Sequence, residues 1–203
     1  MNKILMDDLN LLQPTFDSTK EIFVSKLQSD DNSVNIKNIS FKLLNVNGNI
    51  LELEFLCSSS DFYLFLLKLD DVMKSVLVAK WNEWFGGNLN DETLNNLYKL
   101  SVTLPTKIPS LPYFKCCITD DCKILQGRKK MTISDLKHGM QLDLAIIIDG
   151  IQYNKNKCNM NYNTNHIKIV NEICQSFESL FENNENEIHD LNSETNDITA
   201  SVE

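Results

Sequence analysis

Two alternating runs on either side of Asn47-Gly48 constrain the fold of this chain more than any other feature. Apolar and polar residues alternate over residues 39–43 and again over residues 50–55. Such alternation places one set of side chains on each face of an extended strand. Asn and Gly tolerate the positive φ that a tight turn between two strands requires. The sequence therefore predicts a β-hairpin with one face in a core.

A helical segment is predicted after the hairpin. Residues 62–85 contain apolar side chains at mixed spacing and no Gly or Pro, and Gly86-Gly87 follows them. This pattern indicates one long helix or two shorter ones, because glycine commonly ends a helix. Asn90 is expected to begin a second short helix that runs through Leu100. Prolines 105, 109 and 112 then predict an extended linker.

The segment after the linker is predicted to be mainly β. Its apolar runs indicate strands at residues 113–119, 123–125, 140–148 and 166–170. Between them we expect turns at Asp120-Asp121 and Asp149-Gly150 and a polar loop over residues 155–165. Residues 173–181 indicate a short helix. From Asn183 onward the composition is too polar to support packing.

These patterns predict a mixed β/α, mainly β chain with three parts. Residues 1–35, in which residues 16–27 indicate a helix or a strand, are expected to pack on the domain. Residues 36–182 are expected to form the domain itself, with a helical insertion at 61–100. Residues 183–203 are expected to form a disordered acidic tail.

Charge is distributed unevenly along the chain. The formal net charge is −9, from 28 acidic and 19 basic residues. Residues 175–203 contain eight acidic residues and no Lys or Arg, so 20 acidic residues stand against 19 basic ones in residues 1–174. Residues 105–168 contain 10 basic and 5 acidic residues. We therefore expect a basic face on the second half of the body, onto which the acidic tail folds back.

No motif indicates catalysis, a metal or a cofactor. The chain lacks a Gly-x-Ser-x-Gly element, a phosphate loop and a dinucleotide fingerprint. Cys116, Cys117 and Cys122 form one cluster, whereas a structural zinc site uses two spaced pairs, so buried small residues are the simpler interpretation. A Cys–His nucleophile stays open as an alternative. No apolar run approaches the roughly 20 residues of a membrane helix. We expect an intracellular binding protein rather than an enzyme.

The basic segment combines the two residue types that hold a single nucleic-acid strand. A cationic groove neutralises phosphates, and bases stack on exposed aromatic rings, each contributing about 1–3 kcal/mol. The expected phosphate contacts, one of them in the hairpin, are Lys42, Lys115, Lys123, Arg128, Lys129, Lys130, Lys155 and Lys157. The expected base-stacking residues are Tyr113, Tyr153 and Tyr162.

Residues 113–170 also resemble a known family. A β segment from Tyr113 to Ile118 is followed by Leu136-Lys-His-Gly-Met140, an apolar run over 143–148, Gly150-Ile-Gln-Tyr153 and His166-Ile-Lys-Ile-Val170. This order resembles the C-terminal half of the oligonucleotide-binding (OB) barrel in single-stranded-DNA-binding proteins of large DNA viruses. In that family a Leu-x-x-Gly element leads into a long apolar strand, and a final strand closes the barrel.

The resemblance implies an OB-like antiparallel barrel of about five strands, with the hairpin as its first two and the helices inserted between strands. It further implies single-stranded DNA as partner, a role in viral DNA replication or repair, and a location in the host cytoplasm or nucleus. On this hypothesis the acidic tail competes with DNA and recruits replication proteins. No membrane partner is expected.

A protein–protein interaction module, such as a viral structural or transcription-complex subunit, is the alternative. In that interpretation Trp81, Trp84 and Phe85 form an exposed interface patch, and the lysines keep the chain in solution. Either function is compatible with a homo-oligomer.

Overall fold

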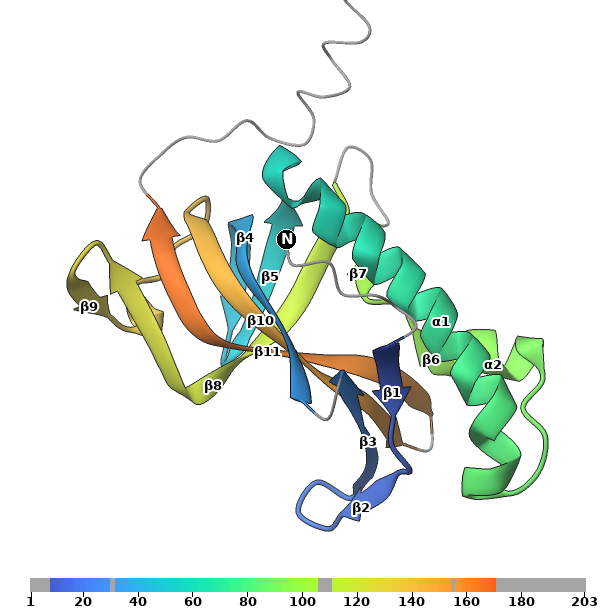
Figure 1. The fold of residues 1–203 in the computed structure, drawn as a ribbon. Helices are drawn as coiled ribbons and strands as arrows, with labels where there is room; N and C mark the ends of the chain where they lie inside the picture. Colours follow the sequence, from blue (N-terminus) through green and yellow to red (C-terminus); the bar gives the residue numbers. More distant parts are fainter. Residues whose placement is uncertain (1–7, 30–31, 106–110, 155, 171–203) are drawn as a thin grey trace, which may run out of the picture.

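The structure, a computed structural model, describes residues 8–29, 32–105, 111–154 and 156–170 (Figure 1). Its two helices and eleven strands lie within these ranges. The helices are α1 (Ser60–Phe85) and α2 (Asp91–Leu97). The strands are β1 (Leu9–Leu11), β2 (Thr15–Asp17), β3 (Ile22–Ser29), β4 (Asn32–Asn47), β5 (Ile50–Phe55), β6 (Tyr98–Lys99), β7 (Val102–Thr103), β8 (Tyr113–Gln126), β9 (Lys129–Met131), β10 (Gln141–Asn154) and β11 (Lys157–Val170). Short 3-10 turns occupy Cys57–Ser59 and Ile133–Asp135.

Five long strands close into a ring. β4 pairs with β5, β5 with β8, β8 with β11, β11 with β10, and β10 returns to β4. The β8–β11 pair is parallel and the other four pairs are antiparallel. Taken in chain order as strands 1 to 5, these strands follow the circuit 1-2-3-5-4-1. This is the strand order of a five-stranded Greek-key barrel of the OB type, so the mainly β, OB-like fold expected from the sequence is confirmed. The expected antiparallel barrel is corrected to a mixed one, because β8 and β11 run parallel.

Smaller elements surround the ring and make the barrel irregular. β3 adds to one edge of β10, and β1 and β2 pair with β3. β6, β7 and β9 attach to β11 and β8. The helices lie between β5 and β8, and α1 runs along one side of the sheet (Figure 1). Among the described residues, no helix has the combined length and apolarity needed to cross a membrane.

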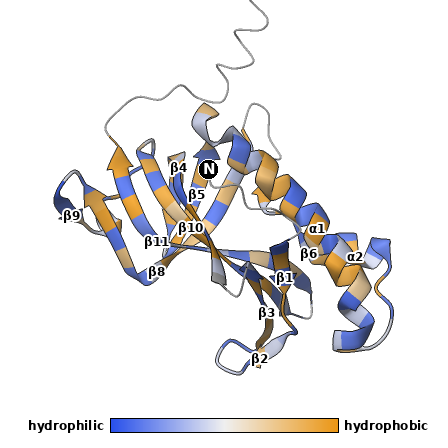
Figure 2. Ribbon diagram, viewed as in Figure 1, coloured by the Kyte–Doolittle hydropathy of each residue, from blue (hydrophilic) through white to orange (hydrophobic). Residues whose placement is uncertain are grey.

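The core fills the barrel and continues beneath α1. Alternating colours along the long strands in Figure 2 show one apolar and one polar face per strand. Phe41, Phe62 and Phe114 are fully buried, and their ring centroids lie 5.5–5.9 Å apart. Further along α1, Leu66, Leu69, Met73 and Leu77 are also fully buried, at the spacing that gives a helix one apolar face. Replacing any of these phenylalanines by Ala should destabilise the fold by about 3–5 kcal/mol.

A buried carboxylate connects α1 to the strands that follow it. Asp70 accepts hydrogen bonds from the Tyr98 hydroxyl at 2.8 Å and from the Ser101 hydroxyl and backbone N–H at 2.6 and 2.8 Å. Burial raises the pKa of this carboxyl, although the three donors oppose the shift. These bonds fix β6 and β7 against the helix, which positions one wall of the cleft described below.

The hairpin about Asn47-Gly48 is confirmed, and the helical segment is one 26-residue helix rather than two. The second helix is shorter than expected. It ends at Leu97, because Tyr98 and Lys99 pair with β11. Residues 16–27, whose pattern indicates a helix or a strand, lie in strands β2 and β3 and the turn between them.

Three predicted interruptions are wrong, because long strands run through them. β8 continues through Asp120-Asp121, with both carboxylates exposed, as its pairing passes from β5 to β11. β10 continues through Asp149-Gly150. The glycine is needed there for close approach rather than for a turn, since a Cβ at Gly150 would lie 1.9 Å from the Ser25 carbonyl oxygen of β3.

The third interruption is the predicted polar loop over residues 155–165, most of which is strand β11. Cys158, Met160, Tyr162 and Thr164 are buried, and the asparagines between them face outward. Asparagine has low β propensity, but the buried alternate residues decide the conformation. The helix predicted at 173–181 and the acidic tail lie outside the described residues.

Candidate nucleic-acid interface

A cleft of about 310 Å³ crosses the outer surface of the barrel where β5, β8 and β11 meet. We call it the barrel cleft. It lies between the β4–β5 turn and the β10–β11 turn, and β6 and β7 form its remaining wall. Its lining includes the side chains of Ile50, Lys99, Leu100, Lys115, Lys157 and Asn159. In OB barrels this face, with these two turns, is where oligonucleotides bind.

Three cations converge on the barrel cleft from distant parts of the chain. Lys115 comes from β8 and Lys157 from the start of β11. Lys99 is opposite Asn159 in the parallel β6–β11 pair. Two apolar side chains are exposed beside them, Ile50 at 37% and Leu100 at 47%. The cleft thus offers positive charge and exposed apolar surface together.

Carboxylates of β5 partly neutralise the cations on this face. The Lys115 Nζ atom lies 2.7 Å from Glu52 Oε1, and the Lys42 Nζ atom lies 3.4 Å from Glu54 Oε1. The hydrogen bond between Lys115 and Glu52 lowers the pKa of the Glu52 carboxyl and raises the pKa of the Lys115 ammonium. Both predicted phosphate contacts are on the surface, but each is already paired with a carboxylate.

The stacking roles predicted for Tyr153 and Tyr162 are wrong, because both rings are in the core. Their exposed fractions are 4% and 5%. Tyr153 packs against Phe85 with centroids 5.3 Å apart, and its hydroxyl donates to Ser25 Oγ at 3.1 Å. Tyr162 packs against Phe114 at 4.9 Å and shares a hydrogen bond with the Ser101 hydroxyl. Burial raises the pKa of both phenols. Both rings are too buried for a base to stack on their faces, although Tyr162 also lines the barrel cleft.

Tyr113 is the one predicted stacking residue that stays at the surface. It is half-buried on β8, opposite Thr103 of β7, and Thr103 lines the barrel cleft. The Lys115 Nζ atom lies 5.3 Å from the centroid of its ring, within the range of a cation–π contact. Tyr113 therefore lies at the edge of the cleft.

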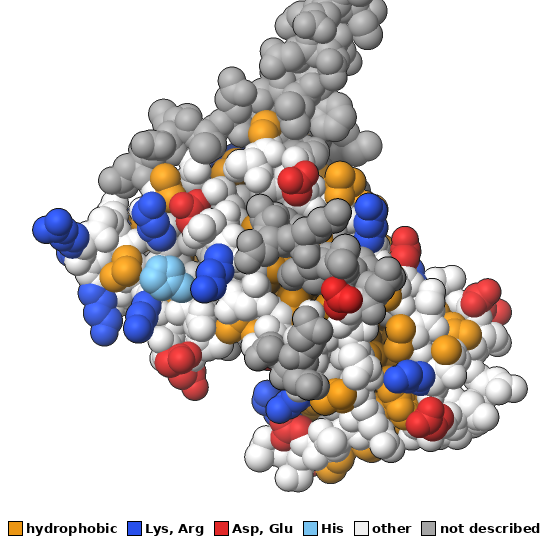
Figure 3. Space-filling model, in the orientation of Figure 1, with side chains coloured by type: hydrophobic (Ala, Val, Ile, Leu, Met, Phe, Trp, Pro, Cys, Tyr) orange, Lys and Arg blue, Asp and Glu red, His pale blue; other side chains and the backbone are white. Residues whose placement is uncertain are grey.

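The other predicted cations lie on a separate surface, where β8 leaves β5 and joins β9 and β11. Figure 3 shows Lys and Arg side chains gathered there around a histidine. Lys123 is opposite His166, and both Lys130 and Lys168 are opposite Leu125. We call this the basic surface; its exposed members are Lys37, Lys123, Arg128, Lys129, Lys130, His166 and Lys168. Lys155 lies outside the described residues.

A second cleft on the basic surface has a volume of about 440 Å³. Lys37 of β4 lies on one side, and His166 and Lys168 of β11 lie on the other. One carboxylate, Asp143, lines it and accepts a hydrogen bond from Ser40 Oγ at 2.5 Å. Within the described residues, no cation of the basic surface forms an ion pair.

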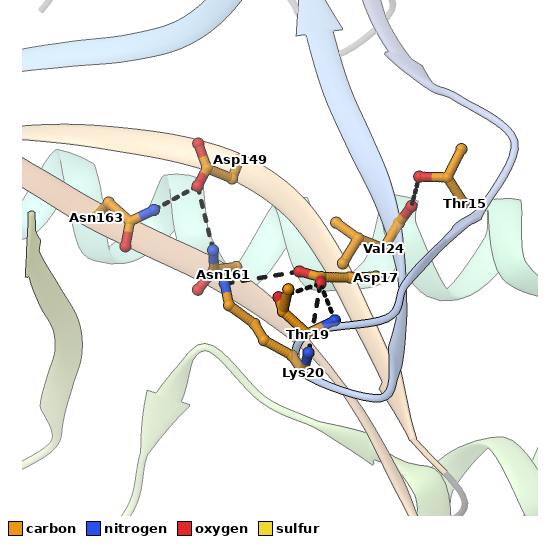
Figure 4. Close-up of polar contacts among 8 residues, drawn as sticks. All are labelled: Thr15, Asp17, Thr19, Lys20, Val24, Asp149, Asn161 and Asn163. Carbon is orange, nitrogen blue, oxygen red and sulfur yellow. Dashed lines mark hydrogen bonds and ion pairs between the residues drawn. The ribbon is translucent and has the colours of Figure 1, made fainter.

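A third cleft, of about 630 Å³, lies between the β2–β3 hairpin and β10 (Figure 4). Asp149 accepts hydrogen bonds from the side-chain amides of Asn161, at 3.2 Å, and Asn163. Burial raises the pKa of the Asp149 carboxyl. Lys20 Nζ lies 4.0 Å from Asp17 Oδ2. Because its carboxylates offset its lysines, this cleft is a weaker candidate for binding phosphates.

Sequence reasoning missed Lys99, Leu100, Ile50 and Asn159 of the barrel cleft. Lys99 and Leu100 were assigned to a helix, and a parallel pairing across 60 residues leaves no local signal for their true position. The asparagines of β11 could have been found. The alternation of Cys158, Met160 and Tyr162 with polar residues is a strand pattern. Among the described residues, no three His, Cys, Asp or Glu side chains are grouped to hold a metal ion.

Comparisons with known proteins give structural matches only. No protein-family model matches the chain, and no curated protein does. The chain is similar to the single-stranded DNA-binding protein from bacteriophage Enc34 in complex with ssDNA, with 12% identity and a TM-score of 0.42, covering 82% of this chain and 98% of that one. A second structure of that phage protein matches with 11% identity and a TM-score of 0.43, covering 83% and 93%. At this level of similarity, the barrel assignment rests on the strand pairing described above.

Proposed function

We propose that this chain is a single-stranded-nucleic-acid-binding protein that holds the strand in the barrel cleft. The observation that carries the proposal is the convergence of Lys99, Lys115 and Lys157 with two exposed apolar side chains on one cleft. The cleft lies on the face that OB barrels use for oligonucleotides. On this proposal the protein binds the strand and does not catalyse a reaction.

The side chains of the cleft suit a strand with unpaired bases. Lys99 and Lys157 would contact phosphates, since neither pairs with a carboxylate within the described residues. Ile50, Leu100 and the ring of Tyr113 would contact the faces of bases, which are accessible when the bases are unpaired. Asn159 offers a donor and an acceptor to base edges or to the backbone.

The finer role belongs to the same proposal. A protein that coats single strands without chemistry would serve DNA replication or repair, and the sequence resemblance favours a viral setting. The alternative function, a protein–protein module, needs Trp81, Trp84 and Phe85 exposed together. All three are partly buried and pack against the core, so this patch is smaller than the alternative requires.

A titration of labelled oligo-dT by fluorescence anisotropy tests the proposal. We expect binding at 50 mM salt that weakens steeply by 200 mM. The double variant Lys99→Ala/Lys157→Ala should lower affinity by about 25-fold at 0.1 M salt, from two lost phosphate contacts. Lys68→Ala/Lys80→Ala, on α1, is the matched control and should bind normally. A folded wild-type protein that binds no oligonucleotide at 50 mM salt would exclude the function.

A further inference from the structure

The basic surface is the strongest feature that the proposed site does not use. It carries seven exposed cationic or imidazole side chains from β4, β8, β9, β11 and the β8–β9 turn. Cations that face solvent without carboxylate partners attract anions more strongly than paired ones do. Strand pairing fixes the arrangement: Lys168 and Lys130 flank Leu125 in one cross-strand row, and His166 and Lys123 form the neighbouring row. Residues in one row point to the same face of a sheet.

The outer face of β11 connects the two surfaces. Asn159 and Asn161 line the barrel cleft, and Asn165, His166 and Lys168 line the cleft of the basic surface. Asn163 lies between them, and the side-chain amides of Asn161 and Asn163 both donate to Asp149. From residue 159 to residue 168 a strand extends about 30 Å at roughly 3.3 Å per residue. One strand thus carries a continuous series of polar side chains from one cleft to the other.

The chemistry of the second cleft suits phosphate rather than base. Two lysines and a histidine line it, together with the polar side chains of Asn35, Asn38 and Asn165, and its described lining contains no Phe, Tyr or Trp. Its one carboxylate, Asp143, lies opposite Lys168 in the β10–β11 pair and accepts a hydrogen bond from Ser40. Such a surface would contact the sugar-phosphate backbone without stacking and without reading sequence.

We propose that a single strand bound in the barrel cleft continues along β11 and that its flanking phosphates bind the basic surface through Lys37 and Lys168. This inference rests on the proposed function and extends its footprint. The barrel cleft contacts bases and phosphates, and the basic surface contacts phosphates alone. Short oligonucleotides therefore fill only the barrel cleft, whereas longer ones engage both surfaces.

Oligonucleotides of two lengths test the inference on the full chain. Affinities of oligo-dT of about 6 and about 20 nucleotides, which bracket the site sizes of OB domains, are measured at several salt concentrations. For Lys37→Ala/Lys168→Ala we expect unchanged affinity for the short oligonucleotide. For the long one, we expect about 25-fold weaker binding at 0.1 M salt and a slope of log K against log salt shallower by about 1.4. The control Lys68→Ala/Lys80→Ala removes equal charge from α1 and should change neither.

Each other outcome overturns the inference in a distinct way. Equal losses for both lengths would place Lys37 and Lys168 in the primary site. No loss for either length would free the basic surface for a different partner, such as an acidic protein. If the wild-type chain binds neither oligonucleotide, the proposed function itself fails, and the inference fails with it. Circular dichroism of each variant confirms folding before affinities are compared.

Discussion

The barrel cleft and the basic surface both present lysines, but their lysines have different neighbours. In and beside the barrel cleft, Glu52 and Glu54 hold Lys115 and Lys42 in ion pairs, whereas Lys99 and Lys157 have no such pair within the described residues. On the basic surface, the described lysines have no carboxylate partner within ion-pair distance. A paired lysine is positioned but partly neutralised, whereas an unpaired one attracts anions over longer distances. On the proposed function, the paired lysines of the cleft would position a strand, and the basic surface would attract it.

The largest expected effect comes from the β8–β9 turn of the basic surface. The triple variant Arg128→Ala/Lys129→Ala/Lys130→Ala should lower affinity for a long oligonucleotide by up to about 30-fold at 0.2 M salt. This figure assumes that each lost phosphate contact makes the slope of log K against log salt shallower by about 0.7. Stopped-flow kinetics should show that the association rate falls more than the dissociation rate rises. A change in the dissociation rate alone would mean that the turn positions the strand rather than attracting it.

The next largest effect should follow deletion of residues 183–203, which carry a large share of the excess negative charge. Removing a competitor for the cations should tighten oligo-dT binding about 10-fold at 50 mM salt, and the gain should disappear at high salt. If the tail competes at the basic surface, the deletion should gain less in the Lys37→Ala/Lys168→Ala background. Unchanged affinity at low salt would contradict the competition.

A smaller gain is expected from Glu52→Gln in the barrel cleft. This change removes the carboxylate that pairs with Lys115 and leaves the lysine able to contact phosphate. One additional contact should raise affinity about 5-fold at 0.1 M salt and steepen the salt slope by about 0.7. The matched change Glu83→Gln, at an exposed position of α1, should leave the affinity and the salt slope unchanged. Equal effects of the two variants would show that only net charge matters.

The smallest effect on binding is expected from Tyr162→Phe. The lost hydroxyl shares a hydrogen bond with Ser101 in the core, so the variant should lose about 1 kcal/mol of stability in urea unfolding. Affinity for oligo-dT should change by less than about 2-fold, because the only group removed is a hydroxyl that is hydrogen-bonded to Ser101 in the core. A loss of affinity without a loss of stability would restore Tyr162 to the binding site.

Local pattern was enough to predict parts of the fold and not others. The hairpin about Asn47-Gly48 and the helix after it depend on near neighbours in the chain. The continuity of β10 through Gly150 depends on β3, whose carbonyl at Ser25 approaches the glycine from more than 100 residues away. No pattern around Asp149-Gly150 distinguishes this close approach from a turn.

The candidate site shows the same limit. Lysines 115 and 157 were found because charge is visible in the sequence. The tyrosines were misassigned because polar neighbours suggested exposure, whereas the alternation along β11 puts Tyr162 inside. Lys99 reached the cleft through a parallel pairing that only the assembled fold provides.

The most direct test of the central claim is hydrogen–deuterium exchange of the full chain with and without oligo-dT. Binding in the barrel cleft predicts slower exchange at β6, at residues 157–161 of β11 and at the β4–β5 turn. It predicts no change along the exposed face of α1. Protection confined to α1 or to the β2–β3 hairpin, with the barrel cleft unchanged, would contradict the account.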